Sequence, residues 1–193
     1  MATRQISDVQ SPDFAHALRT LHAARLRPEV RLTEVPAPTR LAPHAVAMTA
    51  DIVDPADDED IATGRFVLLH DPDEPEPWGS AWRVVTFSRA ELEAEVAGDP
   101  MLGAVGWSWL TDALEAHGIE PVNLAGTVTH VVSEAFADLE AREPEVEMEI
   151  RASWSPTDSS VGRHLEAWID MLATVGGLPP LPSGVVALPG RRR

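Results

Sequence analysis

Residues Glu145 to Ser155 alternate between polar and apolar side chains without interruption. The apolar positions are Val146, Met148, Ile150, Ala152 and Trp154. Because successive side chains of a β-strand point to opposite faces, this pattern predicts one long strand with a dry face and a wet face. A strand buried on one face is typical of an antiparallel sheet, since parallel sheets are usually covered on both sides. A second layer must therefore cover the dry face, and amphipathic helices elsewhere in the chain can supply it.

Apolar periodicity in the rest of the chain predicts an α+β fold, a mostly antiparallel sheet of about six strands with helices packed on one face. The expected order is α-ββββ-αα-ββ-α, with strands at 29–35, 44–50, 64–70, 79–87, 124–136 and 145–155 and helices beginning at Ser11, Ser88, Trp107 and Val161. The helix at Ser88 is expected because Ser88-Arg-Ala-Glu91 has the form of a capping box. The loop 137–144 would join the last two strands as a hairpin. One register sets Glu134 opposite Glu147, which like charges disfavour.

The chain is long enough for one domain that buries a core without disulfides or metal ions. Residues 11–175 are expected to form that domain, with a disordered segment at 1–10 and an irregular Pro/Gly-rich tail at 176–193. The N-terminus lacks the apolar core of a signal peptide, and no apolar run reaches the roughly 18 residues of a membrane span. These features predict a cytoplasmic protein that does not enter a membrane.

The charge of the chain narrows the possible partners and chemistry. The net charge is −16, and all 15 basic residues are arginine. Such a surface repels phosphate backbones, which disfavours nucleic-acid binding, and it favours solubility or a basic partner. The lack of cysteine and lysine excludes thiol nucleophiles, thiolate metal sites, Schiff-base chemistry and a P-loop.

Two tryptophans and two arginines are the candidates for partner contact. Trp82, Trp107, Trp154 and Trp168 lie on the predicted core faces, where packing is the simpler explanation. Trp109 points about 200° away from Trp107 on a helix, and Trp78 lies in a proline-rich loop. We expect Trp78 and Trp109 to anchor an interface, although packing at the edge of the core is the alternative. Arg25 and Arg27 belong to the one basic concentration outside the tail.

No catalytic motif is present. Gly-x-Ser-x-Gly, Gly-x-x-x-x-Gly-Lys and Gly-x-Gly-x-x-Gly do not occur, and the seven histidines show no paired metal-ligand spacing. An alternative function would use a ligand cleft between the sheet and the helix at Trp107, lined by Arg65, His70, Arg83 and His130. The acidic loop 51–60 could hold calcium, but it lacks the EF-hand spacing, so a solvated loop is expected. We expect no cofactor and no metal.

Five segments of the chain resemble a known family: Ala24–Val30, Pro36–Pro43, Ala62–Pro72, Val105–Leu114 and Glu149–Pro156. Together they are similar to uncharacterised actinobacterial proteins that are catalogued as a domain of unknown function, number three thousand in that series. The resemblance covers roughly residues 12 to 175. It implies a cytoplasmic, actinobacterial source, and it implies no activity, cofactor or catalytic residue.

These observations favour a non-enzymatic interaction or regulatory protein that acts through an acidic, tryptophan-bearing surface. A homodimer is expected, because the order of elements is similar to that of small acidic secretion chaperones, which are commonly dimeric. The alternatives are a small-molecule-binding protein or enzyme that uses the cleft beside Trp107, and an RNA cofactor that uses Arg25, Arg27 and Arg31.

Overall fold

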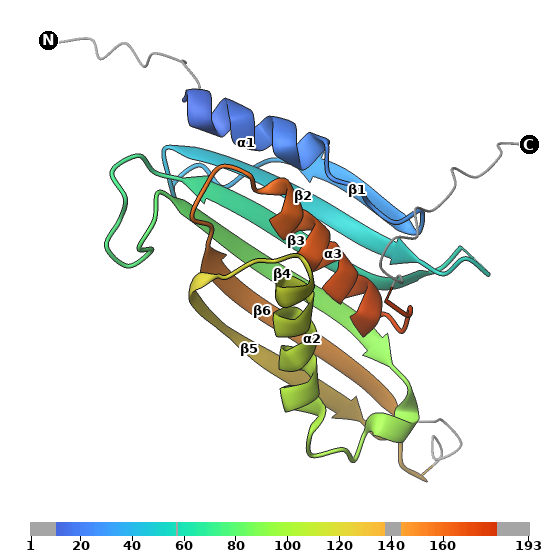
Figure 1. The fold of residues 1–193 in the computed structure, drawn as a ribbon. Helices are drawn as coiled ribbons and strands as arrows, with labels where there is room; N and C mark the ends of the chain where they lie inside the picture. Colours follow the sequence, from blue (N-terminus) through green and yellow to red (C-terminus); the bar gives the residue numbers. More distant parts are fainter. Residues whose placement is uncertain (1–10, 57, 138–143, 181–193) are drawn as a thin grey trace, which may run out of the picture.

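The computed structural model describes residues 11–56, 58–137 and 144–180. Its six strands form one antiparallel sheet in the spatial order β1-β2-β3-β4-β6-β5 (Figure 1). The elements in chain order are α1 (Pro12–His22), β1 (Val30–Val35), β2 (His44–Val53), β3 (Asp60–His70), β4 (Trp82–Leu92), the 3-10 helix η1 (Ala94–Val96), α2 (Leu102–Ala116), β5 (Val122–Ser133), β6 (Glu145–Ser155) and α3 (Gly162–Val175). The predicted α+β class and antiparallel sheet are confirmed.

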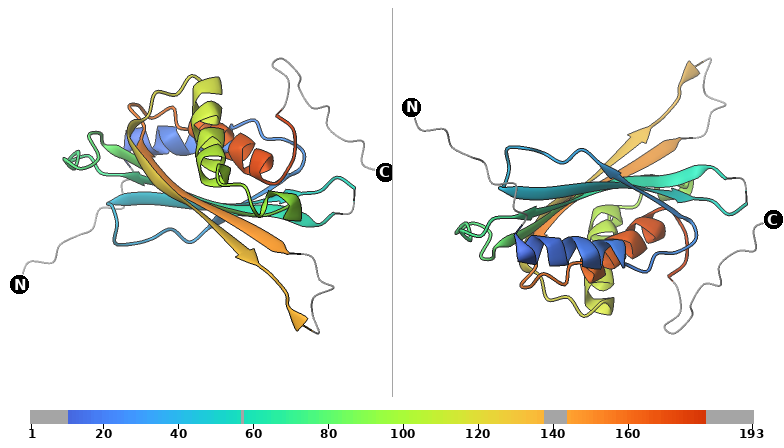
Figure 2. Two further views of the ribbon diagram at one scale, coloured as in Figure 1. Left: turned by 90° about the horizontal axis from the view of Figure 1, so that it is seen from below. Right: turned by 90° about the horizontal axis from the view of Figure 1, so that it is seen from above.

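All three described α-helices lie on one side of the sheet, and none of them lies on the opposite side, here called the open face (Figure 2). The strand predicted from Glu145 to Ser155 has those same bounds as β6. Its apolar side chains face the helices, and its buried positions alternate with less buried ones as far as Trp154. The alternation in β6 therefore sets which face of the sheet is dry.

Two indole groups fix α3 to the sheet. The Nε1–H of Trp154 in β6 donates to Nδ1 of His164 at 2.9 Å, and the Nε1–H of Trp168 in α3 donates to the Ser88 hydroxyl of β4 at 2.9 Å. Both indoles are fully buried. Burial lowers the pKa of His164 to about 4, so the ring is neutral at pH 7 and its Nδ1 is free to accept the bond.

The helix predicted from the capping box at Ser88 is wrong. β4 continues through Ser88 to Leu92 and is followed only by the short η1. Ser88 lies on the helix side of β4, and its buried hydroxyl bonds Trp168 instead of capping a helix. The tertiary contact outweighs the local capping signal. The observed order is therefore α-ββββ-α-ββ-α, with one α-helix between β4 and β5.

Other boundaries differ by a few residues. β4 begins at Trp82 and not at Gly79, and α2 begins at Leu102, five residues before Trp107. In the β5–β6 pair, Val131 lies opposite Glu147, so the register that sets Glu134 there does not occur. The predicted disordered segment 1–10 and most of the tail and hairpin loop lie outside the described residues.

A glycine in β3 allows the close approach of α3. A Cβ placed on Gly64 would lie 2.6 Å from Trp168 Cζ2 and 2.7 Å from the Phe87 carbonyl oxygen. Both distances are far below van der Waals contact, and the second partner is backbone, which cannot move aside. Gly64 is therefore a position where the sheet and α3 meet too closely for any side chain.

We predict that Gly64→Ala lowers the free energy of unfolding by about 1–3 kcal/mol, the usual cost of overpacking a core. Urea denaturation followed by tryptophan fluorescence measures this change. Gly103→Ala is the matched control, because a Cβ at Gly103 meets nothing within 4 Å. An alanine inside α2 should leave stability unchanged or raise it by up to about 1 kcal/mol. Equal stability of the two variants would contradict the packing described here.

Candidate functional site

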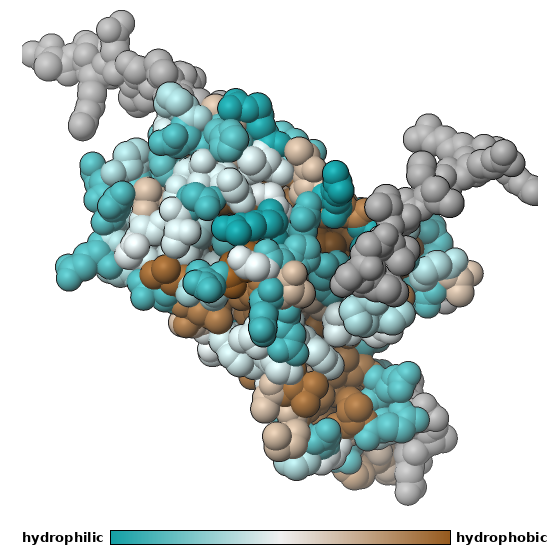
Figure 3. Space-filling model, in the orientation of Figure 1, coloured by the Kyte–Doolittle hydropathy of each residue, from teal (hydrophilic) through white to brown (hydrophobic). Residues whose placement is uncertain are grey.

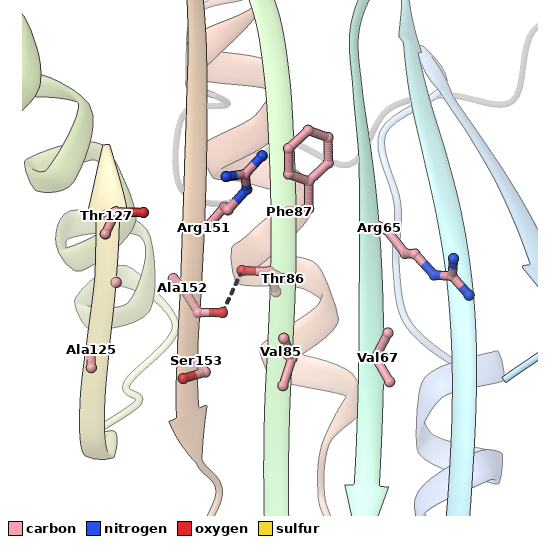
Figure 4. Close-up of a pocket in the computed structure, with 11 residues that line it drawn as sticks. Arg65, Val67, Val85, Thr86, Phe87, Ala125, Thr127, Arg151, Ala152 and Ser153 are labelled. Atoms are coloured by element: carbon pink, nitrogen blue, oxygen red, sulfur yellow. Dashed lines mark hydrogen bonds between the residues drawn. The ribbon is translucent and has the colours of Figure 1, made fainter. Parts of the chain in front are cut away.

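Two neighbouring rows of side chains cross the open face. The strand registers place Ala47, Val67, Val85, Ser153 and Ala125 in one row and Thr49, Arg65, Phe87, Arg151 and Thr127 in the other. The parts of these rows on β3, β4, β6 and β5 line a shallow hollow of ≈ 530 Å³ (Figure 4). This volume falls in the range of ordinary ligand sites, but the hollow is open along one side of the sheet.

The floor of the hollow is apolar. Val67, Val85 and Phe87 project from adjacent central strands toward solvent. Val85 is 39% exposed although β4 is flanked on both sides by other strands. Apolar groups gathered on the wet face of a central strand are a feature of surfaces that meet another molecule.

The rim of the hollow is cationic. Of the residues that line it, only Arg65 and Arg151 are charged. The Arg151 guanidinium lies 5.4 Å from the centre of the Phe87 ring and donates to Glu149 at 2.7 Å. Arg65 donates to the carbonyl oxygen of Pro36 at 3.0 Å and forms no ion pair with a described carboxylate. The charge of Arg65 is therefore not balanced by a described carboxylate, in a chain of net charge −16.

Arg83 supports the end of the hollow next to β5. Its guanidinium donates to the Ser153 hydroxyl at 2.6 Å, the Ser155 hydroxyl at 3.2 Å and the Asn123 carbonyl at 3.0 Å. It therefore joins β4, β6 and β5 across the open face. Partial burial lowers the pKa of Arg83, but arginine keeps its charge at neutral pH. No described carboxylate pairs with it either, which adds to the positive charge.

Part of the open face next to β2 is covered. Ala47 of β2 and Leu69 of β3 point to this face and are nevertheless buried. The connector 36–43 between β1 and β2 runs on the side of the sheet away from the helices (Figure 2). The hydrogen bond from Arg65 to the Pro36 carbonyl attaches the start of this connector to β3. The hollow is therefore bounded on the β2 side by this connector and on the other side by β5.

The four residues predicted to line a cleft beside Trp107 do not come together. Arg65 and Arg83 lie on the open face, whereas His70 and His130 lie on the helix side. His70 is buried below α1 and lies tilted against Trp82, with ring centroids 4.1 Å apart. His130 is exposed on β5, opposite Met148. Two of the four, Arg65 and Arg83, instead belong to the open face.

The buried His70 has a structural environment. Its ring contacts His44, Phe14 and Trp82, and its Nδ1 has no hydrogen-bond partner among the described residues. Burial, and then the charge of His44, lower the pKa of His70, while Asp13 and Asp71 raise it. A neutral ring inside an aromatic stack is the expected result.

The predicted contact residues occupy separate places. Trp109 is half-buried and packs against the core from α2. Trp78 is half-buried in the β3–β4 loop, and its backbone carbonyl accepts a hydrogen bond from Asn123. Arg27 is buried, donating to Glu29 at 3.4 Å and to the Pro179 carbonyl at 2.9 Å. The backbone N–H of Arg25 donates to Glu166 of α3 at 2.6 Å, and its side chain is exposed. None of these four lines the hollow.

Several acidic side chains of the loop 51–60 have partners within the protein. Asp58 pairs with Arg31 at 2.5 Å, Asp60 pairs with it at 3.5 Å, and Asp51 accepts a bond from Thr63 at 2.7 Å. In the part of the chain that the structure describes, no group of three or more histidine, aspartate or glutamate side chains is arranged to hold a metal ion. None of the described helices is long and apolar enough to cross a membrane.

A histidine–carboxylate pair joins α2 to α3. His117, at the end of α2, lies 2.8 Å from Asp170 Oδ2 and 3.8 Å from Glu166 Oε2. The hydrogen bond to Asp170 raises the pKa of His117, burial opposes this, and the charges of Asp170 and Glu166 raise it further. Among the described residues, no hydroxyl group bonds to His117, so the pair lacks the nucleophile of a hydrolase. Its evident role is to hold the two helices together.

The sequence indicated the components of the hollow but not their assembly. Arg83, Val85 and Phe87 alternate onto the wet face of one strand, so two apolar residues fall where polar ones are expected. Their neighbours on β3, β6 and β5 are known only from the registers, which the sequence does not specify.

We predict that His117→Gln destabilises the protein more at about pH 6 than at about pH 9. A raised pKa gives stability that is fully present below the unfolded value of about 6.5 and is lost as pH rises through the folded value. The effect at low pH should not exceed about 1 kcal/mol, because the pair is partly exposed. Denaturant unfolding at both pH values measures it. In an Asp170→Asn background the pH dependence of the His117→Gln effect should largely disappear, and its persistence would contradict the pairing.

Comparison with known proteins places the chain in a family. No curated protein and no solved structure matches it. Residues 10–186 match the sequence model of a family described as "Protein of unknown function (DUF3000)". The match covers most of the 193 residues, including every helix and strand described above. The chain therefore belongs to the DUF3000 family of proteins of unknown function.

Proposed function

We propose that this protein is a non-enzymatic interaction protein that binds a partner polypeptide on the open face. The observation that carries the proposal is an apolar floor, with Val85 exposed and Val67 and Phe87 half-buried, beside Arg65 and Arg83, which pair with no described carboxylate. The partner would present apolar side chains to the floor and carboxylates to Arg65 and Arg83. A nucleic acid is disfavoured because the chain as a whole repels phosphate.

The shape of the hollow favours a polypeptide over a small ligand. Binding sites for small molecules usually enclose most of the ligand surface. The hollow has a floor of sheet and low sides, and it extends across four strands, β3, β4, β6 and β5. An extended segment or a helix lying across it would contact Val85 and Phe87 near the centre, where interface energy is usually concentrated.

Trp78 and Trp109 are part of the proposal only as secondary contacts. Each is half-buried, so each keeps some surface for a partner. Trp109 also packs against the core, and its replacement would change stability as well as binding. The cytoplasmic location and the actinobacterial source belong to the proposal as well, and they rest on the family resemblance.

A small-molecule function is the second candidate. It is favoured by the volume of ≈ 530 Å³ and by Arg65 and Arg151, which would bind the acid group of an amphipathic organic anion. An aromatic sulfonate such as anilinonaphthalene sulfonate is a suitable probe. Saturable binding at one site per chain that Arg65→Gln abolishes would favour this candidate over the first.

We predict that Val85→Asp removes partner binding while the protein stays folded. The variant is compared with wild type and with Met101→Asp, which makes the same change at an exposed apolar residue on the helix side. Each protein captures partners from an extract of the source organism, and calorimetry then measures affinity for the purified partner. Loss of a central apolar contact should weaken binding by about tenfold or more. Equal affinity of the two aspartate variants would refute the proposed site.

A further inference from the structure

The two edges of the sheet differ in how they are protected. Each edge strand has a row of backbone N–H and C=O groups that pair with no other strand, and proteins usually guard such edges with charges, proline or short length. β1 is six residues long, carries Arg31 and Glu34, and is followed at once by Pro36. Arg31 also forms ion pairs with Asp58 and Asp60 beside this edge. β1 is therefore guarded in all three ways.

β5 has none of these guards. It is 12 residues long, pairs only with β6 and contains no proline. It is also the only strand of the sheet without an aspartate, glutamate or arginine. In a chain of net charge −16, a strand of this length without a formal charge stands out.

The free end of β5 is also apolar. Val131 is 52% exposed and Val132 is 36% exposed, and Phe136, just beyond the strand, is 73% exposed. On the helix side, hydrophobic residues gather at the end of the molecule opposite α1, in the region of η1 and the end of β5 (Figure 3). At its start, β5 is covered, because Asn123 donates to the carbonyls of Pro77 and Trp78 in the β3–β4 loop. The open edge therefore runs from Leu124 to Ser133.

We propose that this edge pairs with the same edge of a second copy of the chain, in antiparallel register, to join two six-stranded sheets into one. The distribution of charge indicates that the partner of the β5 edge is a second copy of the chain. A basic partner would gain nothing from an edge that bears no acid, whereas two copies of a strongly acidic chain can approach only where like charges are absent. The next strand inward, β6, carries Glu145, Glu147 and Glu149 on the open face.

The spacing of strands keeps the β6 glutamates of the two copies far enough apart to limit their repulsion. Neighbouring strands lie about 4.8 Å apart, so the β6 strands of two copies joined through β5 would be about 14 Å apart. This separation exceeds the Debye length of about 8 Å at physiological salt, so their glutamates are largely screened from each other. The cross-strand pairs themselves would be formed by valine and threonine, which favour pairing in sheets.

The geometry of such a pair has a consequence for binding. Antiparallel pairing of identical edges requires a two-fold axis perpendicular to the sheet, so both open faces lie on the same side. The hollow includes Ala125, Gly126 and Thr127 of β5. Two hollows would then adjoin across the new strand pair. This inference does not depend on the proposed function. The substitution that tests it, at Thr129, lies outside the hollow and can change dimerisation without changing the proposed partner site.

Sedimentation equilibrium of the full-length chain tests the inference with Thr129→Lys. Thr129 lies opposite Glu149 within the chain, so the lysine has a favourable partner there and β5–β6 pairing is retained. In the proposed dimer, two lysines face each other near the centre of the new pair, and dimer affinity should fall by about tenfold or more. Thr33→Lys, the same change at an exposed position of the guarded edge, should have no effect. A monomeric wild type, or a dimer that both variants leave unchanged, would overturn the proposal.

Cross-linking gives an independent test that does not require Thr129→Lys to fold. The chain contains no cysteine, so a single introduced cysteine can link only to another copy. With a short bismaleimide, Thr129→Cys should give covalent dimers and Thr33→Cys should remain monomeric. Equal yields from the two edges would count against β5 as the interface.

Discussion

The structure depends on the burial of two indoles between α3 and the sheet. The Trp154 side chain projects from β6 toward α3, and the Trp168 side chain projects from α3 toward the sheet. Each buried indole N–H donates a hydrogen bond, from Trp154 to His164 and from Trp168 to Ser88. A buried donor without a partner would cost free energy, so these bonds determine where each ring can lie. They also explain the residues around them: a neutral histidine at 164, a serine inside strand β4, and a glycine at 64 where a side chain would collide with Trp168.

Because the helices pack on one face of the sheet, the residues of the open face are not needed for the core. The core requires only one side of the sheet, so the open face is free to carry residues that serve another purpose. Part of it is covered by the connector 36–43, and the hollow beside it has an apolar floor next to Arg65 and Arg83, which pair with no described carboxylate. The proposed partner site is an apolar region with neighbouring arginines, on the side of the sheet that the described helices leave uncovered. The edge strand without charges lies directly beside it.

The sequence predicted the fold well because its strands are amphipathic. Alternation specified β6 to the residue, and helical periodicity located α1 and α3. The helix expected at Ser88 failed because a capping box is a local signal, and in the folded chain that serine is needed by Trp168, 80 residues away in sequence. Local propensity gives way where a buried polar group requires a partner.

The site could not be predicted to the same degree. Its residues come from four strands, and their assembly depends on registers that no local pattern encodes. The predicted cleft combined residues from both faces, since the face of a strand is readable only when its alternation is clear. Arg65 and Arg83 were identified as candidates, but Val67, Val85 and Phe87 were not, because apolar residues in a strand are normally assigned to the core.

The central claim is that neighbouring residues of β4 face a sealed helix layer and an open surface. Val84 is fully buried, and Val85 is exposed on the other face. The rate at which a thiol reagent labels Val84→Cys and Val85→Cys under native conditions measures this difference directly, in a chain that has no other cysteine. We expect rapid labelling of the cysteine at position 85, whereas the cysteine at position 84 should be labelled only as fast as the protein unfolds. Equal protection of both cysteines, or faster labelling at 84, would contradict it.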